Sequence, residues 1–211
     1  MSLPSVATRP ATADLLINEQ LQKSYTRAEH PKLRELAVVP LFEKFLNTWL
    51  GCDDLGVYSQ QHLDESGQQV DLTVGFFDED PLPNPVFVLL VECKRQEIPS
   101  LGELEAQLEE YGDRYLHTEL GGLAKHSSVY GASAFGGKIR FFRFLRAHGY
   151  FDGETYFGTY KICDEGQYYD LKTGDIKIHE ALSDIWKFYV SSTALLSSTQ
   201  PPLSMRPDLQ R

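Results

Sequence analysis

Residues 86–94, VFVLLVECK, decide the fold that we predict for this chain of 211 residues. Six consecutive apolar residues are typical of a strand in the middle of a sheet, covered by other layers on both faces. The apolar run ends at Glu92, Cys93 and Lys94. Because side chains alternate along a strand, Glu92 and Lys94 are expected to face the same way, where burying their charges is costly unless they are paired or bind a metal. The stretch therefore predicts a central strand that ends in a charged site.

A second carboxylate is expected on a neighbouring strand. Residues 70–76 alternate apolar with small or polar residues, which predicts a strand with one buried face and with Asp71 near its start. Residues 78–85 are rich in turn formers and predict a hairpin-like connection. Two carboxylates at similar depth in a sheet can hold Mg²⁺ or Mn²⁺, and Lys94 would then orient or help deprotonate an attacking water. The alternative is an ion pair at the strand ends that serves only stability or solubility.

Helical and strand patterns follow one another along the rest of the chain. The further predicted elements are helices over residues 32–50, 100–120 and 180–190, and strands over residues 57–63, 128–135, 138–145, 156–162 and 167–178. This order predicts an α/β protein, a three-layer α/β/α sandwich around a central mixed β-sheet. Residues 27–192 are expected to form one domain, preceded by an arm or marginal first helix over residues 1–26 and followed by a disordered tail over residues 193–211.

The composition predicts a globular, intracellular protein, cytoplasmic or nuclear. The chain is 42% hydrophobic and 24% charged, which is ordinary for a packed domain. It has no apolar run long enough to span a bilayer and no secretory pattern at its start, so no membrane partner is expected. Cys52, Cys93 and Cys163 stand far apart and predict isolated reduced thiols.

Charge is distributed unevenly along the chain. The formal net charge of -10 disfavours contact with phosphate backbones. Residues 121–151, in contrast, contain several Lys and Arg residues and neither Asp nor Glu. We predict that Lys125, Lys138, Arg140 and Arg143 line a groove for phosphates. The alternative is a solvated sheet edge, where basic residues discourage edge pairing.

The order of these features resembles the PD-(D/E)XK nuclease superfamily. Asp71 is followed, after a turn and a strand, by Glu92-Cys93-Lys94, although Val70 stands where the family often has proline. Glu35, on the helix before the sheet, matches the additional acidic residue of the family, with Glu43 as a reserve candidate. Gln107 and Tyr111, four residues apart on the helix after the motif, match the Gln-x-x-x-Tyr signature of the RecB-type branch.

The resemblance implies a restriction-endonuclease-like fold and a nuclease that depends on Mg²⁺ or Mn²⁺ and acts on DNA in preference to RNA. It implies metal ligands at Asp71, Glu92, Glu35 and the backbone carbonyl of Cys93, with Lys94 and Gln107 also in the catalytic site and Tyr111 near the nucleic acid. The competing hypothesis is a catalytically inactive nuclease fold that acts as an interaction or scaffold module. The sequence leaves open whether the chain forms a homodimer or binds another protein.

Overall fold

The computed structural model describes residues 14–30, 32, 34–52, 54–62, 69–78, 84–94, 101–117, 128–145 and 168–199. These residues form the helices α1 (Glu19–Glu29), α2 (Arg34–Trp49), α3 (Leu101–His117) and α4 (Asp175–Thr199). They also form the strands β1 (Gly56–His62), β2 (Gln69–Asp78), β3 (Asn84–Lys94), β4 (Ser128–Phe135), β5 (Lys138–Leu145) and β6 (Tyr169–Asp170). The strand predicted over residues 70–76 and the helix predicted over residues 100–120, on either side of residues 86–94, are therefore present.

The strands form one mixed sheet in the order β1-β2-β3-β4-β5-β6. Neighbouring strands are antiparallel except β3 and β4, which are parallel and are connected through α3. A parallel pair needs such a crossover, whereas β4 and β5 need only a tight turn. That turn is at Gly136-Gly137, and Gly136 adopts a left-handed conformation with φ of 54°. The α/β class and the mixed sheet are confirmed.

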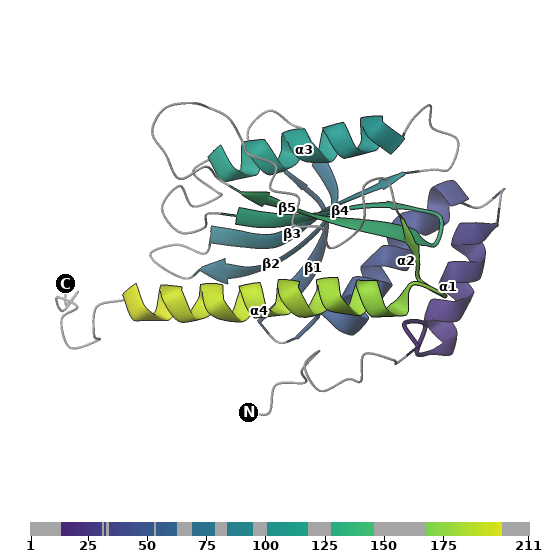
Figure 1. Ribbon diagram of the computed structural model, residues 1–211, viewed down its shortest axis with the longest axis horizontal. Helices are drawn as coiled ribbons and strands as arrows, with labels where there is room; N and C mark the ends of the chain where they lie inside the picture. The colour runs from purple at the N-terminus through teal and green to yellow at the C-terminus, as the bar shows by residue number, and fades with distance from the viewer. Residues whose placement is uncertain are drawn as a thin grey trace, which may run out of the picture.

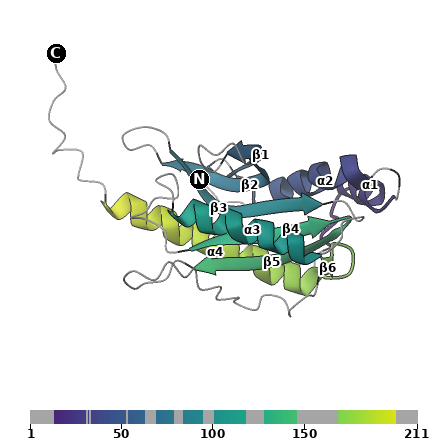
Figure 2. The same cartoon turned by 90° about the horizontal axis from the view of Figure 1, so that it is seen from above.

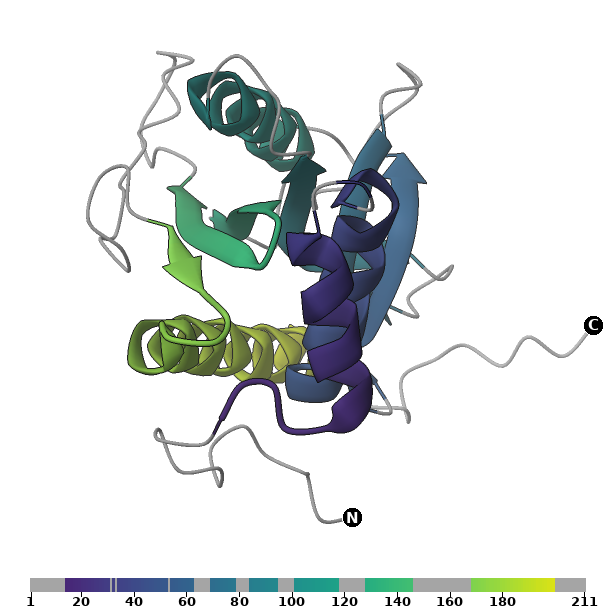
Figure 3. The same ribbon diagram turned by 90° about the vertical axis from the view of Figure 1, so that its right-hand side faces the viewer.

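Helices cover both faces of the sheet. Figure 1 shows α3 on one side of the strands and α4 on the other, and the end-on view in Figure 3 places α1 and α2 at one end of the sheet. The main core lies between the sheet and α1, α2 and α4, with Phe42, Phe45 and Leu182 among its buried members. A smaller core lies under α3, where Leu108 and Tyr115 pack on the sheet. In the view from above, α3 lies over the middle strands (Figure 2).

Helix α1 runs across the domain boundary predicted at residue 26, in the segment for which an arm or a marginal first helix was predicted. The Asn18 side chain caps this helix by accepting a hydrogen bond of 2.9 Å from the Leu21 N–H. Leu15 is buried, and its carbonyl accepts a hydrogen bond of 3.1 Å from the indole N–H of Trp49 in α2. The short apolar patch that begins at Leu15 therefore anchors residues 14–29 to the main core instead of leaving them as an arm.

The C-terminal elements also differ from the prediction. Only Tyr169–Asp170 of the strand predicted over residues 167–178 is a strand, because α4 begins at Asp175. That helix continues to Thr199, beyond the domain end predicted at residue 192. The Ser191 and Thr193 hydroxyls bond back to the carbonyls of Lys187 and Tyr189, so polar residues that suggested disorder continue the helix. The strand predicted over residues 156–162 lies outside the described residues.

No helix in the described ranges is both long and apolar enough to cross a membrane.

Candidate active site

Pairing of β2 with β3 places the two predicted carboxylates side by side. Leu72 pairs with Val91, and both belong to the main core on the α2 and α4 side. The next residue outward on each strand, Asp71 and Glu92, must therefore face α3. The Cys93 N–H donates a hydrogen bond of 2.8 Å to Asp71 Oδ2, which joins the Asp71 carboxylate to the end of β3. This alignment follows from antiparallel register, which sequence spacing alone does not fix.

Glu92 is a buried carboxylate with only part of its hydrogen-bonding capacity used. It is 3% exposed, and its Oε1 lies 3.2 Å from the Lys94 ammonium. Its Oε2 is buried and has no hydrogen-bond partner within the described part of the chain. Leaving such an atom unpaired costs free energy, and a cation near it would remove that cost.

Burial disfavours the ionised forms of both carboxylates, and the charge of Asp71 adds to this effect at Glu92. Loss of solvent, and then the charge of Asp71, raise the pKa of Glu92 to about 7, although Lys94 opposes this shift. Burial likewise raises the pKa of Asp71 above its usual range, against the hydrogen bond from Cys93 and the charge of Lys94. A divalent cation bound between the two groups would favour their ionised forms.

Lys94 occupies the solvent side of this pair. It follows Glu92 by two residues on β3, so it points to the same face of the sheet. Its side chain is 32% exposed, whereas that of Glu92 is almost fully buried. The ammonium is thus close to the carboxylates and still open to a ligand that arrives from solvent.

Helix α3 brings Gln107 and Tyr111 over the same site. Gln107 Nε2 donates a hydrogen bond of 2.7 Å to Tyr111 Oη, and Tyr111 is 5% exposed. Burial raises the pKa of Tyr111, and the charges of Glu92 and Asp71 raise it further while Lys94 lowers it. Tyr111 therefore lies within the electrostatic reach of the carboxylate pair.

A polar network extends the site across the sheet. Glu92 pairs in register with Ser133 of β4, and Ser133 pairs with Arg140 of β5. Arg140 Nη1 lies 2.7 Å from Glu105 Oε1 on α3. The Tyr168 hydroxyl lies 2.6 Å from Ser133 Oγ and donates to Glu105 Oε1 at 3.1 Å.

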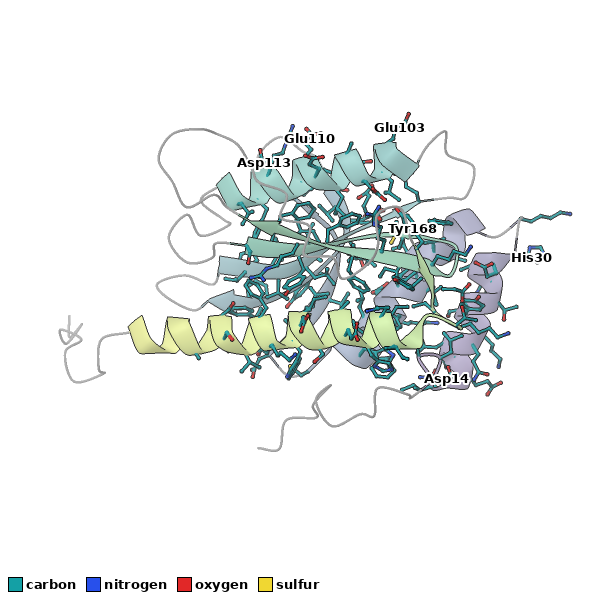
Figure 4. The ribbon with its side chains drawn as sticks, viewed as in Figure 1. Asp14, His30, Glu103, Glu110, Asp113 and Tyr168 are labelled. Atoms are coloured by element: carbon teal, nitrogen blue, oxygen red, sulfur yellow. The ribbon has the colours of Figure 1, made fainter. Side chains whose placement is uncertain are left out.

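This network could not be predicted from the sequence, because Tyr168 and Ser133 become neighbours only when the sheet forms. An available signal was the even spacing of Lys138 and Arg140, which puts them on one face of β5. Figure 4 shows Tyr168 on the sheet side of α3, whereas Glu103, Glu110 and Asp113 point away from the sheet. Those three acidic residues of α3 are therefore separate from the site.

The three described residues of the predicted phosphate groove, Lys138, Arg140 and Arg143, do not lie together. Lys125 is outside the described residues. Arg140 is 6% exposed and is paired with Glu105. Arg143 lies on the opposite face of the sheet, where its guanidinium stacks 5.6 Å from the Tyr130 ring centroid and 6.0 Å from that of Phe188 in α4. The odd spacing between Arg140 and Arg143 explains the separation, because residues an odd number apart on a strand face opposite ways. Of the three described residues, Lys138 is the one that lies on the α3 face without an ion pair to Glu105, so it remains the candidate phosphate contact.

The acidic candidates on α2 are not part of the described site. Glu35 lies at the start of α2, and its side chain is outside the described part of the structure. Glu43 lines a surface pocket with Asn18 and Thr48, between α1 and α2. Within the ranges described, no group of three or more His, Cys, Asp or Glu side chains is placed to hold a metal ion. The carboxylate pair is therefore the part of the predicted metal site that the structure describes.

Comparisons with protein-family models, curated proteins and solved structures find no match to this chain.

Proposed function

We propose that this chain is an intracellular nuclease of the PD-(D/E)XK kind, with a restriction-endonuclease-like fold, that depends on Mg²⁺ or Mn²⁺ and hydrolyses DNA in preference to RNA. One observation carries the proposal. Asp71 and Glu92 lie side by side at the end of adjacent strands with Lys94 on the same face, and Glu92 Oε2 is buried without a partner. A divalent cation between the two carboxylates would satisfy this buried oxygen.

The donors of the pair suit a hard divalent cation. Carboxylate oxygens from Asp71 and Glu92 would hold Mg²⁺ or Mn²⁺, and waters and a phosphate oxygen would complete the shell. Glu35 and the Cys93 carbonyl stay predicted additional ligands. Such an ion, when bound, supplies electrostatic stabilisation of the charge that develops on the phosphate.

The side chains around the pair have separate tasks in hydrolysis. The Lys94 ammonium orients the attacking water and offsets charge on the scissile phosphate. The water oxygen forms a bond to phosphorus as the bond to the leaving oxygen breaks. Because burial keeps Tyr111 protonated, its hydroxyl can donate to the site while it accepts from Gln107.

The test is cleavage of DNA with Mg²⁺ or Mn²⁺ and with EDTA, by wild-type protein, Glu92→Ala and Lys94→Ala. We expect metal-dependent cleavage that falls by at least about 100-fold in each variant, because each removes a group that stabilises the transition state. Lys187→Ala is the matched control, since Lys187 is an exposed lysine of α4. Circular dichroism and urea unfolding check that the variants fold. Wild-type rates in both folded site variants would show that the proposal is wrong.

A second candidate function is a scaffold that keeps the nuclease fold without its activity. The net charge of -10 and the presence of only two ligating carboxylates in the described site favour it. Calorimetric titration with Mn²⁺ separates the two functions. Binding that Asp71→Asn weakens supports the nuclease, whereas no binding at millimolar Mn²⁺ supports the scaffold.

A further inference from the structure

Two lysines lie in one row across the end of the sheet. Lys94 of β3 pairs in register with Phe135 of β4, and Phe135 pairs with Lys138 of β5. Lys94 faces α3, and residues paired directly across strands face the same way, so Phe135 and Lys138 face α3 as well. We call these three residues the lysine row. On each strand it lies two residues further toward this end of the sheet than the row formed by Glu92, Ser133 and Arg140.

Lys138 is available to a ligand in a way that Arg140 and Arg143 are not. Its ammonium lies 5.9 Å from the Phe135 ring centroid, and its side chain is half-buried. Asp170, its register partner on β6, instead accepts hydrogen bonds from the Tyr25 hydroxyl at 2.9 Å and from the Lys172 N–H at 2.7 Å. Within the described ranges, no carboxylate lies at ion-pair distance from Lys138.

The spacing and order of the lysine row suit a single nucleic-acid strand. Adjacent strands of a sheet are about 4.8 Å apart, so the backbones of Lys94 and Lys138 are separated by roughly 10 Å. Between them lies the half-buried Phe135 ring, whose centroid is 4.7 Å from that of Tyr168. Cations that contact phosphates, interleaved with aromatic rings that contact bases, are how proteins bind unpaired strands.

We propose that Lys138 binds a second phosphate of the strand whose scissile phosphate lies at Lys94, and that Phe135 contacts an unpaired base between them. The substrate strand then crosses β3, β4 and β5 at right angles to them. This inference rests on the proposed nuclease function, because it places the scissile phosphate at Lys94. It assigns the site to a single-stranded stretch of DNA rather than to an intact duplex.

The experiment measures binding without cleavage. Fluorescence anisotropy in EDTA gives the Kd of a labelled single-stranded oligonucleotide and of a duplex of the same length over a series of salt concentrations. The proteins are wild type, Lys138→Ala, Phe135→Leu and, as a matched control, Lys177→Ala on α4. Phe135→Leu keeps an apolar side chain and removes only the aromatic face.

Each variant has its own expected result on the single strand. Loss of one phosphate contact lowers the slope of log Kd against log salt by about 0.7 in Lys138→Ala. Loss of base contact raises the Kd of Phe135→Leu about fivefold or more without changing that slope. Lys177→Ala should leave both the Kd and the slope unchanged, because Lys177 lies on α4, away from the proposed path of the oligonucleotide.

Three outcomes overturn the inference. The first is that the wild type does not bind the single-stranded oligonucleotide, and the second is that the salt slope is unchanged in folded Lys138→Ala. The third is that Phe135→Leu loses equal affinity for the single strand and for the duplex. An unchanged slope in Lys138→Ala alongside metal-dependent cleavage by the wild type would refute the lysine row alone. A lowered salt slope in Lys138→Ala, together with no cleavage by the wild type, would refute the nuclease function and keep the lysine row as a binding site.

Discussion

The two faces of the sheet differ in what their side chains do. On the α2 and α4 side, buried apolar residues run from end to end of the strands, as Val74, Val91 and Phe141 illustrate. On the α3 side, the apolar core is smaller and is bordered by Asp71 near the start of β2 and Glu92 near the end of β3. The large core stabilises the fold, and the other face can therefore hold carboxylates whose charged forms are disfavoured by burial. The large apolar core and the candidate site therefore lie on opposite faces of the same sheet.

The largest effect on stability is expected on the apolar face. Phe45 of α2 is fully buried in the main core, so Phe45→Ala should lower the free energy of unfolding by about 3–5 kcal/mol. Val190→Ala is the control, since Val190 on α4 is 43% exposed and its loss should change stability by less than about 0.5 kcal/mol. Urea unfolding at pH 7 measures both. A small loss in Phe45→Ala would mean that the main core does not carry the stability of the fold.

The polar face should make stability depend on pH in the opposite sense to an ordinary ion pair. The pKa of Glu92 is raised from 4.5 to about 7 in the folded protein. Between these values the folded state binds more protons than the unfolded state, so stability falls as pH rises from about 4.5 to about 7. The loss amounts to at most about 3 kcal/mol, and the raised pKa of Asp71 acts in the same direction.

Glu92→Gln isolates this effect, because the amide does not titrate. Urea unfolding in EDTA at pH 5, 6, 7 and 8 should show the variant gaining stability relative to wild type as pH rises. Added Mn²⁺ should oppose the loss in the wild type and have little effect on the variant, because metal binding displaces the protons of the carboxylates. Parallel pH profiles for the two proteins would show that Glu92 titrates normally.

The same contrast explains which features the sequence could predict. The apolar run before Glu92 identified the central strand, and helical spacing of apolar residues in residues 32–50 identified α2. Both could be predicted because buried positions are occupied by apolar residues. The pairing of Asp71 with Glu92 was expected from their depth in neighbouring strands. Its geometry, including the unpaired Oε2, depends on register and on side-chain packing, which periodicity does not encode.

Polar contacts between distant segments were beyond sequence reasoning. Ser133, Arg140, Glu105 and Tyr168 come from four different parts of the chain, and none forms a motif. Grouping Arg140 with Arg143 failed because charge was counted along the chain without regard to the alternation of strand faces. The extent of α4 was underestimated because its last turns are rich in Ser and Thr, whose propensity for loops is overridden by bonds to the preceding turn.

The smallest of these effects tests how the polar face is held together. The register between β2 and β3 shifts at Val74 and Gly75, and there the Phe87 N–H donates a hydrogen bond of 2.7 Å to the hydroxyl of Tyr115 on α3. Tyr115→Phe leaves this buried N–H without its partner and should lower the free energy of unfolding by about 1–3 kcal/mol. Tyr58→Phe on the edge strand β1, where the ring is half-buried, should change it by less than about 0.5 kcal/mol. Urea unfolding of both variants decides between two descriptions of the α3 layer. Equal stabilities would mean that the Tyr115 hydrogen bond does not help to hold α3 on the sheet, and a loss specific to Tyr115→Phe would show that a hydrogen bond at the strand irregularity fixes the helix that carries Gln107 and Tyr111.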